Sequence, residues 1–285
     1  MKVPLNIDLE GKVAVVTGGG GVLCGYFSEA LAACGAKVAV LDLRKGAAEK
    51  VVKKITDNGG TALAVEANVL QLQSLQKAEK IISEEFGTYN ILINGAGGNH
   101  PKGTTSKEFL FKEDLEGKNK DDISFFDLEP EGVKFVFDLN FLGTLLPTQV
   151  FGRKMVNQKG AVIINMSSMN AFKPLTKIPA YSGAKAAVSN FTQWLSVHMS
   201  KVGIRVNAIA PGFFLTDQNR DLLIKNDGSF TERAKKIINQ TPMERFGKPE
   251  DLIGTLLWLI DEEASGFVNG IVVPVDGGFS AYSGV

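Results

Sequence analysis

The segment YSGAK contains a tyrosine and a lysine four residues apart, Tyr181 and Lys185. The surrounding sequence, AYSGAKAAVSNFTQWLSVHMS, is typical of a helix, on which residues at this spacing share a face. A phenol with an ordinary pKa near ~10 is a poor acid or base at neutral pH, and a neighbouring ammonium favours the phenolate. The pair therefore predicts a proton-transfer site in which Lys185 lowers the pKa of Tyr181.

A serine precedes this pair at the end of a predicted strand. The run AVIINMSS ends at Ser168, thirteen residues before Tyr181. Open α/β sheets bind ligands at the carboxyl ends of their strands, so the Ser168 hydroxyl can hold a substrate oxygen. We expect no metal site, because two distant histidines and two cysteines are not a plausible ligand set. His198, among apolar helix residues, is interpreted as structural.

A glycine-rich turn, TGGGGVLCG from Thr17 to Gly25, follows the first predicted strand. Such a turn exposes backbone N–H groups and the positive end of a helix dipole, which suits a pyrophosphate. The second predicted strand ends at Asp42, whose carboxylate can accept hydrogen bonds from adenosine ribose hydroxyls and would repel a 2′-phosphate. Arg44 could tolerate that phosphate, but no basic residue lies in the glycine turn. The pattern favours NAD over NADP.

Short β-rich runs alternate with helical patterns along the sequence, which predicts repeated βαβ units. The seven runs are VAVVT from Val13, KVAVLD from Lys37, ALAVEA from Ala62, ILING from Ile91, AVIINMS from Ala161, RVNAIAP from Arg205 and IVVPVD from Ile271. We expect a doubly wound α/β fold of the Rossmann type, with a single seven-stranded parallel sheet and helices on both faces. Residues 1–285 are expected to form one domain. A polar insertion at about 99–126 is either a substrate lid or a solvated surface loop.

In this order, these residues resemble the short-chain dehydrogenase/reductase family along essentially the whole sequence. The resemblance makes Tyr181 the acid/base, Lys185 its pKa modulator and nicotinamide-ribose anchor, and Ser168 the group that orients the carbonyl. Asn140, in FDLNFLGT, matches the fourth residue of the family's catalytic set, an asparagine that supports a water-linked proton path from the lysine. Besides Tyr181 and Lys185, the implied cofactor contacts are Gly18, Gly20, Gly21, Val22, Leu23, Asp42, Asn68, Val69, Asn94, Ala96, Gly97, Pro211, Gly212, Phe214 and Thr216.

The sequence differs from the family pattern at several cofactor positions. Val22 and Cys24 stand where the family usually has its second and third glycines. Asn68 stands where an aspartate often meets the adenine, and Gly95 replaces the second asparagine of NNAG. No catalytic group is lost, so these departures predict altered cofactor contacts in an active enzyme.

The segments INGAGGNHPK, SSMNAFKPLTKIPAYSGAK and PGFFLTDQNR resemble those of one branch of that family, the D-mannonate oxidoreductases (fructuronate reductases) of the short-chain type. That resemblance implies reversible reduction of D-fructuronate to D-mannonate. A polyhydroxylated carboxylate needs hydrogen-bond partners and a cation. The candidates are Asn99, His100, Lys102, Asn170, Lys173, Asn219 and Arg220. For the basic candidates, solvation at the surface is an equal alternative.

Two other functions remain open. Another short-chain reductase activity, on a 3-oxoacyl thioester or another sugar alcohol or gluconate, would keep the same catalytic residues. A non-catalytic NAD-sensing protein would keep the pocket alone, and the altered glycine turn is the feature that favours it.

The composition favours a small-molecule partner over a polymer. Lys and Arg number 31 and so do Asp and Glu, which leaves no net charge to attract nucleic acid or an anionic membrane. The sequence has no apolar run that would span a bilayer and no signal peptide pattern, so we expect a soluble cytoplasmic protein. Cys24 and Cys34 fall roughly 15 Å apart on one predicted helix and should be free thiols. The family resemblance implies a homotetramer.

Overall fold

Seven short strands form one parallel sheet in the computed structural model, which describes residues 7–116, 122–216 and 220–284. The strands are β1 (Val13–Thr17), β2 (Lys37–Asp42), β3 (Thr61–Glu66), β4 (Ile91–Asn94), β5 (Val162–Met166), β6 (Arg205–Pro211) and β7 (Val272–Val275). Their order across the sheet is β3-β2-β1-β4-β5-β6-β7, and every pairing is parallel. The order reverses between β1 and β4, which is where such sheets bind ligands.

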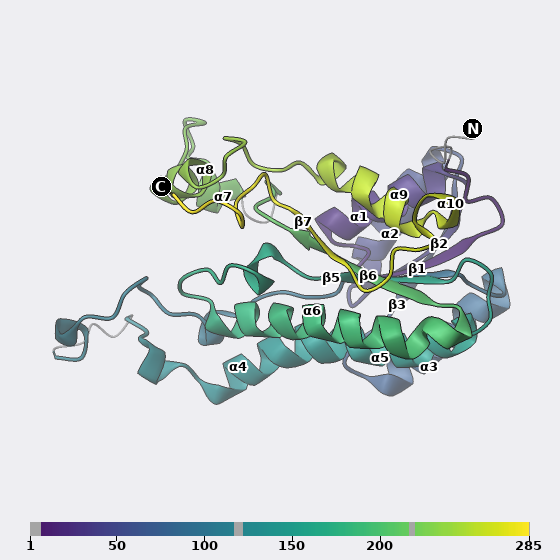
Figure 1. The fold of residues 1–285 in the computed structure, drawn as a ribbon, viewed down its shortest axis with the longest axis horizontal. Helices are drawn as coiled ribbons and strands as arrows, with labels where there is room; N and C mark the ends of the chain where they lie inside the picture. The colour runs from purple at the N-terminus through teal and green to yellow at the C-terminus, as the bar shows by residue number, and fades with distance from the viewer. Residues whose placement is uncertain (1–6, 117–121, 217–219, 285) are drawn as a thin grey trace.

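Helices cover both faces of the sheet (Figure 1). One face is covered by α1 (Val22–Ala33), α2 (Lys45–Asp57) and α9 (Ile253–Ile260), and the other by α3 (Leu72–Phe86), α5 (Gly143–Met155) and α6 (Pro179–Met199). Strand alternation divides the core accordingly, because successive side chains point to opposite faces. Ala14 and Val16 pack toward α1, whereas Val13 and Val15 pack toward α3. The predicted fold class is confirmed.

The remaining elements are short and lie mostly at the carboxyl edge of the sheet. They are η1 (Pro101–Gly103), η2 (Lys112–Asp114), η3 (Phe125–Asp127), α4 (Pro130–Phe137), the π-helical turn η4 (Asp138–Leu142), η5 (Met169–Ala171), η6 (Ser200–Val202), α7 (Arg220–Leu223), α8 (Glu232–Asn239), η7 (Pro249–Leu252) and α10 (Glu262–Ser265). Both cysteines are free. In the described part of the protein, no helix combines the length and hydropathy needed to cross a membrane.

The predicted polar insertion is an arm that projects from the body beyond the start of α4 (Figure 1). We call residues 104–116 and 122–126 the insertion arm; residues 117–121 lie outside the described ranges. Its base is fixed by hydrogen bonds from Thr105 N–H to Lys177 O (2.8 Å) and from Ser106 N–H to Ile123 O (2.8 Å). Lys236 of α8 contacts its Glu108 at 3.1 Å.

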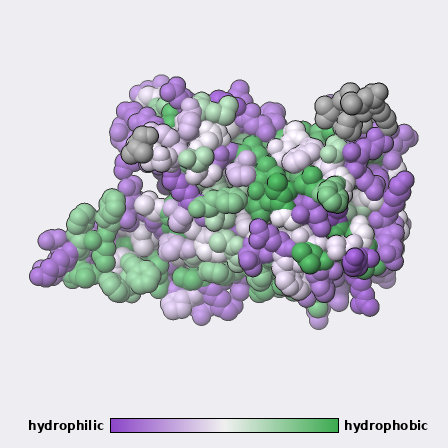
Figure 2. Space-filling view, in the orientation of Figure 1, coloured by the Kyte–Doolittle hydropathy of each residue, from purple (hydrophilic) through white to green (hydrophobic). Residues whose placement is uncertain are grey.

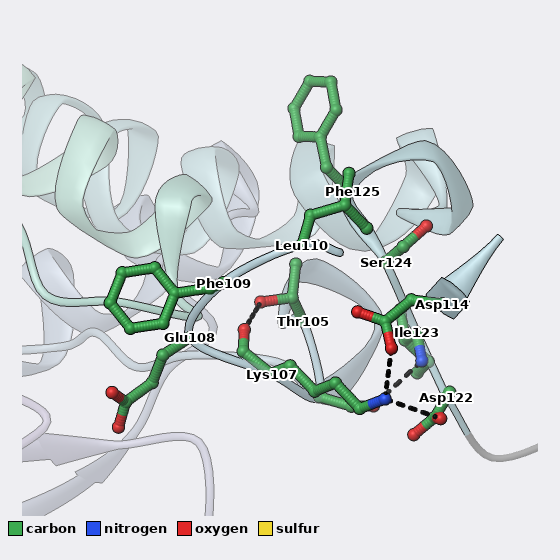
Figure 3. Close-up of a pocket in the computed structure, with 11 residues that line it drawn as sticks. Thr105, Lys107, Glu108, Phe109, Leu110, Asp114, Asp122, Ile123, Ser124 and Phe125 are labelled. Atoms are coloured by element: carbon green, nitrogen blue, oxygen red, sulfur yellow. Dashed lines mark hydrogen bonds and ion pairs between the residues drawn. The ribbon is translucent and has the colours of Figure 1, made fainter. Parts of the chain in front are cut away.

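The insertion arm is less polar at its surface than the sequence predicted. Exposed apolar side chains gather on it, as Figure 2 shows in green: Phe109, Leu110, Phe111, Leu115 and Phe125. Inside the arm, Lys107 forms ion pairs with Asp114 (2.5 Å) and Asp122 (3.2 Å), drawn in Figure 3. The cavity that these residues enclose, about 120 Å³, is far smaller than a typical ligand site.

Candidate active site

A cleft of about 590 Å³ opens at the carboxyl edge of the sheet, where the strand order reverses. We call it the main cleft. Fourteen predicted site residues line it: Gly18, Gly21, Val22, Leu23, Asp42, Asn68, Val69, Ala96, Gly97, Ser168, Tyr181, Lys185, Pro211 and Gly212. The fold therefore brings the predicted cofactor and catalytic positions, which are far apart in the sequence, to one wall.

The glycine turn gains its shape from close backbone packing. Gly18 has a φ of +63°, and a Cβ there would lie 2.9 Å from the Ala96 backbone. Gly21 is the N-cap residue of α1 and, as a glycine, supplies no side-chain cap to the helix N-terminus. The uncapped N–H groups at this end can therefore bind an anion such as a pyrophosphate.

Asp42 lies where the sequence placed it, at the end of β2 and on the wall of the main cleft. Its carboxylate accepts hydrogen bonds from Gly20 N–H (3.2 Å) and Arg44 N–H (3.0 Å). The Asp42 side chain is 11% exposed and that of Arg44 is 72% exposed. Arg44 Nε lies 3.9 Å from Asp42 Oδ1, so a largely buried carboxylate and an exposed guanidinium lie together beside the glycine turn.

Four predicted cofactor residues lie away from the cleft wall. Asn94 is buried between strands, and its Nδ2 donates to Thr148 Oγ1 and to Asn165 Oδ1, both at 2.9 Å. Phe214 is buried against Gly247, where a Cβ would lie 2.6 Å from its ring. Gly20 and Thr216 line a neighbouring hollow on the other side of the glycine turn. The sequence motifs identified these segments but not which way each side chain points.

Asn140, also absent from the cleft wall, is buried in the π-helical turn. Its Nδ2 donates to Gly98 O and to Val136 O, both at 2.7 Å, and its Oδ1 accepts from Gly98 N–H at 3.2 Å. π-Helical turns recur at functional sites. Here the buried amide fixes the loop after β4 beside Lys185, since a Cβ on Gly97 would lie 2.7 Å from Asn140 Oδ1 and 3.2 Å from Lys185 Nζ.

Ser168, Tyr181 and Lys185 all line the main cleft together with Asp42. Lys185 is buried, its Nζ donates to Met166 O at 2.7 Å, and that Nζ lies 5.6 Å from the centre of the Tyr181 ring. The helix thus presents both residues to one site, as their spacing predicted.

Burial changes the pKa values of both members of the pair in this structure. It raises the pKa of Tyr181, and the Ser168 side chain opposes that rise. Burial also lowers the pKa of Lys185 from 10.5 to about 8. Lys185 Nζ donates to Met166 O, and its predicted effect on the Tyr181 pKa stays a prediction.

Three substrate candidates lie together at the entrance to the insertion arm, each held by a local contact. Asn99 Nδ2 donates to Thr104 Oγ1 at 2.9 Å. His100 Nδ1 accepts from Lys102 N–H at 3.2 Å, and the His100 ring packs edge-on against Phe135, which lines the main cleft, at 5.2 Å. Lys102 is paired with Glu129 at 2.7 Å. The predicted cation is therefore neutralised here.

The other candidates follow β5 and β6. Asn170 is buried, and its Oδ1 has no hydrogen-bond partner in the described structure. Lys173 Nζ donates to the Tyr282 and Phe279 carbonyls at 2.7 and 3.4 Å, which ties it to the C-terminal tail, residues 276–284. Arg220 is exposed on α7, and Asn219 lies outside the described residues. No substrate candidate among the described residues lines the main cleft.

Several residues of the cleft wall were not predicted as contacts from the sequence. They are Cys24, Leu43, Arg44, Ala67, Leu70, Gly95, Gly98, Phe135, Leu139, Met166 and Ser167. Most are sequence neighbours of predicted contacts at strand ends, and that position could have identified them. Leu139 is the neighbour of Asn140 in the π-helical turn, whereas Phe135, on α4, carries no comparable local signal.

A family model described as short chain dehydrogenase matches residues 12–227. An oxidoreductase of Haemophilus influenzae is 58% identical over 285 residues, covering 100% of this chain and 99% of that one. The oxidoreductase UxuB of Bacillus subtilis is 56% identical over 283 residues, covering 99% and 100%. A solved Haemophilus structure, provisionally named a D-mannonate oxidoreductase and containing bound NAD, superposes with a TM-score of 0.93 at 57% identity over 98% of this chain and 99% of that one. The protein is therefore an oxidoreductase that belongs to the short-chain dehydrogenase family.

Proposed function

We propose that this protein is an NAD-dependent oxidoreductase that interconverts a keto sugar acid and its hydroxy acid, with D-fructuronate and D-mannonate as the pair. The observation that carries the proposal is that Ser168, Tyr181 and Lys185 line the same cleft as Asp42 and the glycine turn. The provisional name of the Haemophilus relative and its bound NAD support the substrate and the cofactor. Residues 1–285 would act as a single catalytic domain that carries one insertion.

The residues of this site suit reduction of a ketone. NADH, when bound along the main cleft, supplies the hydride. Tyr181 donates the proton to the carbonyl oxygen, and Ser168 holds that oxygen by its hydroxyl. At neutral pH the Tyr181 phenol carries its proton and can serve as the donor, although burial raises its pKa and so makes it a weaker acid than an ordinary phenol.

The two supporting residues act on position and charge. Lys185, anchored on Met166 O, holds its ammonium 5.6 Å from the centre of the Tyr181 ring. Asn140 holds the Gly98 backbone and thereby shapes the loop against which the nicotinamide end would lie. Both roles follow from buried, directed hydrogen bonds, which fix geometry before the substrate arrives.

The preference for NAD rests on Asp42. Its buried carboxylate can accept hydrogen bonds from the ribose hydroxyls, whereas a 2′-phosphate at the same place would meet a like charge. Arg44 lines the same cleft and its Nε lies 3.9 Å from Asp42 Oδ1, but its side chain is 72% exposed, so solvent screening weakens its offset of that repulsion.

We propose the homotetramer that the family resemblance implies, with an exposed aromatic surface on α6 as part of its interface. Trp194 is 57% exposed and stacks between Phe191 (6.2 Å) and His198 (4.8 Å). Leu195, its sequence neighbour, is buried in the core. Light scattering coupled to size-exclusion chromatography measures the state directly, and a monomeric mass would refute the assembly.

The reaction is tested by mixing purified protein with NADH and D-fructuronate and following NADH absorbance. We expect NADH oxidation and formation of D-mannonate, and slower turnover with NADPH. The matched panel contains a 3-oxoacyl thioester and a gluconate-type ketone, each with NADH, and a sugar alcohol with NAD as the hydride acceptor. NADH binding without turnover of D-fructuronate would refute the substrate, and turnover of another panel member would identify the alternative.

A further inference from the structure

Two departures from the family pattern, Cys24 and Gly95, meet in the wall of the main cleft. Cys24 belongs to the first turn of α1, and Gly95 follows β4. Both line the cleft. A Cβ built on Gly95 would overlap the Cys24 Sγ and would also lie 2.8 Å from the Thr17 carbonyl oxygen. The thiol therefore occupies the volume into which a side chain at position 95 would extend.

Neither the loop that carries Gly95 nor the Cys24 side chain can move easily to relieve this overlap. The Thr17 hydroxyl, which is fully buried, accepts hydrogen bonds from Gly95 N–H (3.1 Å) and Ala96 N–H (3.3 Å), and these bonds fix the loop to the end of β1. Cys24 is itself part of the hydrophobic core between α1 and the sheet. Any side chain at position 95 must therefore displace the thiol or move the loop that carries Ala96 and Gly97.

We propose that Cys24 and Gly95 are a mutually dependent pair of positioning residues, in which the Cys24 thiol replaces a side chain at position 95 and sets the cleft wall between the glycine turn and the Ala96–Gly97 loop. The inference rests on the proposed NAD site for its effect on cofactor binding. Burial raises the pKa of the Cys24 thiol to about 12, so at neutral pH the group is an uncharged filler.

The pairing is tested with Gly95→Ala, Cys24→Gly and the double variant. Gly95→Ala should lower Tm by about 4–8 °C, because overpacking a fixed wall forces a backbone shift. It should weaken NADH binding, measured by fluorescence titration, by about tenfold or more. Cys24→Gly alone should also lower Tm, since it empties buried volume. The double variant should nevertheless exceed Gly95→Ala in Tm and recover most of the NADH affinity.

Gly98→Ala is the matched control, because Gly98 lines the same cleft and a Cβ there meets only Leu139, at 3.8 Å. Its Tm should change by less than about 2 °C. A double variant no more stable than Gly95→Ala would overturn the pairing, as would Gly95→Ala with native Tm. If Gly95→Ala fails to fold, a folded double variant supports the pairing and an unfolded one overturns it. Tm is measured without cofactor, so a native protein that fails to bind NADH refutes the proposed function separately from the pairing.

Discussion

At the nucleotide end of the main cleft, the wall is made of backbone, glycine and buried side chains, whereas the charged substrate candidates Lys102 and Lys173, which we call the substrate end, lie outside the cleft wall. Gly18 packs against Ala96, and Asp42 accepts two backbone N–H groups. In contrast, Lys102 pairs with Glu129. Buried contacts leave the residues of the nucleotide end little conformational freedom, whereas exposed ion pairs exchange partners at a low cost in free energy.

The nucleotide end binds a cofactor that the whole family uses, whereas the substrate end must differ from one enzyme of the family to another. The nucleotide end holds a ligand common to many reactions and can be rigid. At the substrate end, Lys102 and Lys173 are already bonded, so a carboxylate must compete with Glu129 or with tail carbonyls for a cation. We therefore expect substrate binding to rearrange these ion pairs and hydrogen bonds, whereas cofactor binding leaves the nucleotide end unchanged.

The largest effect is expected from Tyr181→Phe, which removes the proposed proton donor and leaves the cleft volume nearly unchanged. Turnover of D-fructuronate should fall by about 10²–10⁴-fold, the usual contribution of general acid–base catalysis. The Kd for NADH should stay within a factor of about two. Tyr89→Phe is the matched control, because Tyr89 is buried just before β4, at the opposite edge of the sheet. A fully active Tyr181→Phe enzyme would refute the proposed acid.

The next largest effect is expected from Asp42→Ala at the nucleotide end. Losing a charged hydrogen-bond acceptor costs about 1.5–3 kcal/mol, so the KM for NADH should rise by about 10- to 150-fold. The KM for NADPH should fall because a like charge is removed. Asp57→Ala, at the exposed end of α2, controls for the loss of one carboxylate. An unchanged ratio of NADH to NADPH activity would exclude Asp42 as the specificity residue.

The sequence predicted the nucleotide end far better than the substrate end, for a physical reason. Strand ends and glycine turns are local patterns, so Gly18, Asp42 and Ser168 could be placed on the cleft from spacing alone. The pairing of Lys173 with the C-terminal tail joins segments more than a hundred residues apart. No local pattern encodes such a contact. The same limit applied to the Tyr181 pKa, because burial and the direction of Lys185 depend on the whole fold.

Burial of Lys185 makes a prediction about stability and pH. The folded protein has a Lys185 pKa of about 8, against 10.5 ordinarily, so between these values the unfolded state binds more protons and stability rises with pH. Below pH 8 the buried ammonium costs at most about 3 kcal/mol. Lys185→Met removes this cost, so its Tm advantage over the native protein should be largest at pH 7 and shrink toward pH 10.

Lys77→Met, on the exposed face of α3, controls for the loss of a positive charge. Thermal unfolding of all three cofactor-free proteins at several pH values checks the trend. A difference between Lys185→Met and the native protein that stays constant from pH 7 to pH 10 would show that the lysine titrates normally.

The smallest effects are expected at the substrate end, where Lys173→Met and Lys102→Met form a matched pair. Lys173 donates to two carbonyls of the C-terminal tail, so its loss should loosen residues 276–284 in hydrogen exchange and raise the substrate KM by about threefold to tenfold. Lys102 belongs to an exposed pair with Glu129, and its loss should change KM by less than about threefold. The reverse order, with a large KM effect at Lys102 and an unaltered tail, would mean that Lys102 leaves Glu129 to bind the substrate carboxylate. In that case Lys102 is a recognition residue that exchanges Glu129 for the substrate on binding. The two ends would then differ only in how far their side chains move when a ligand binds.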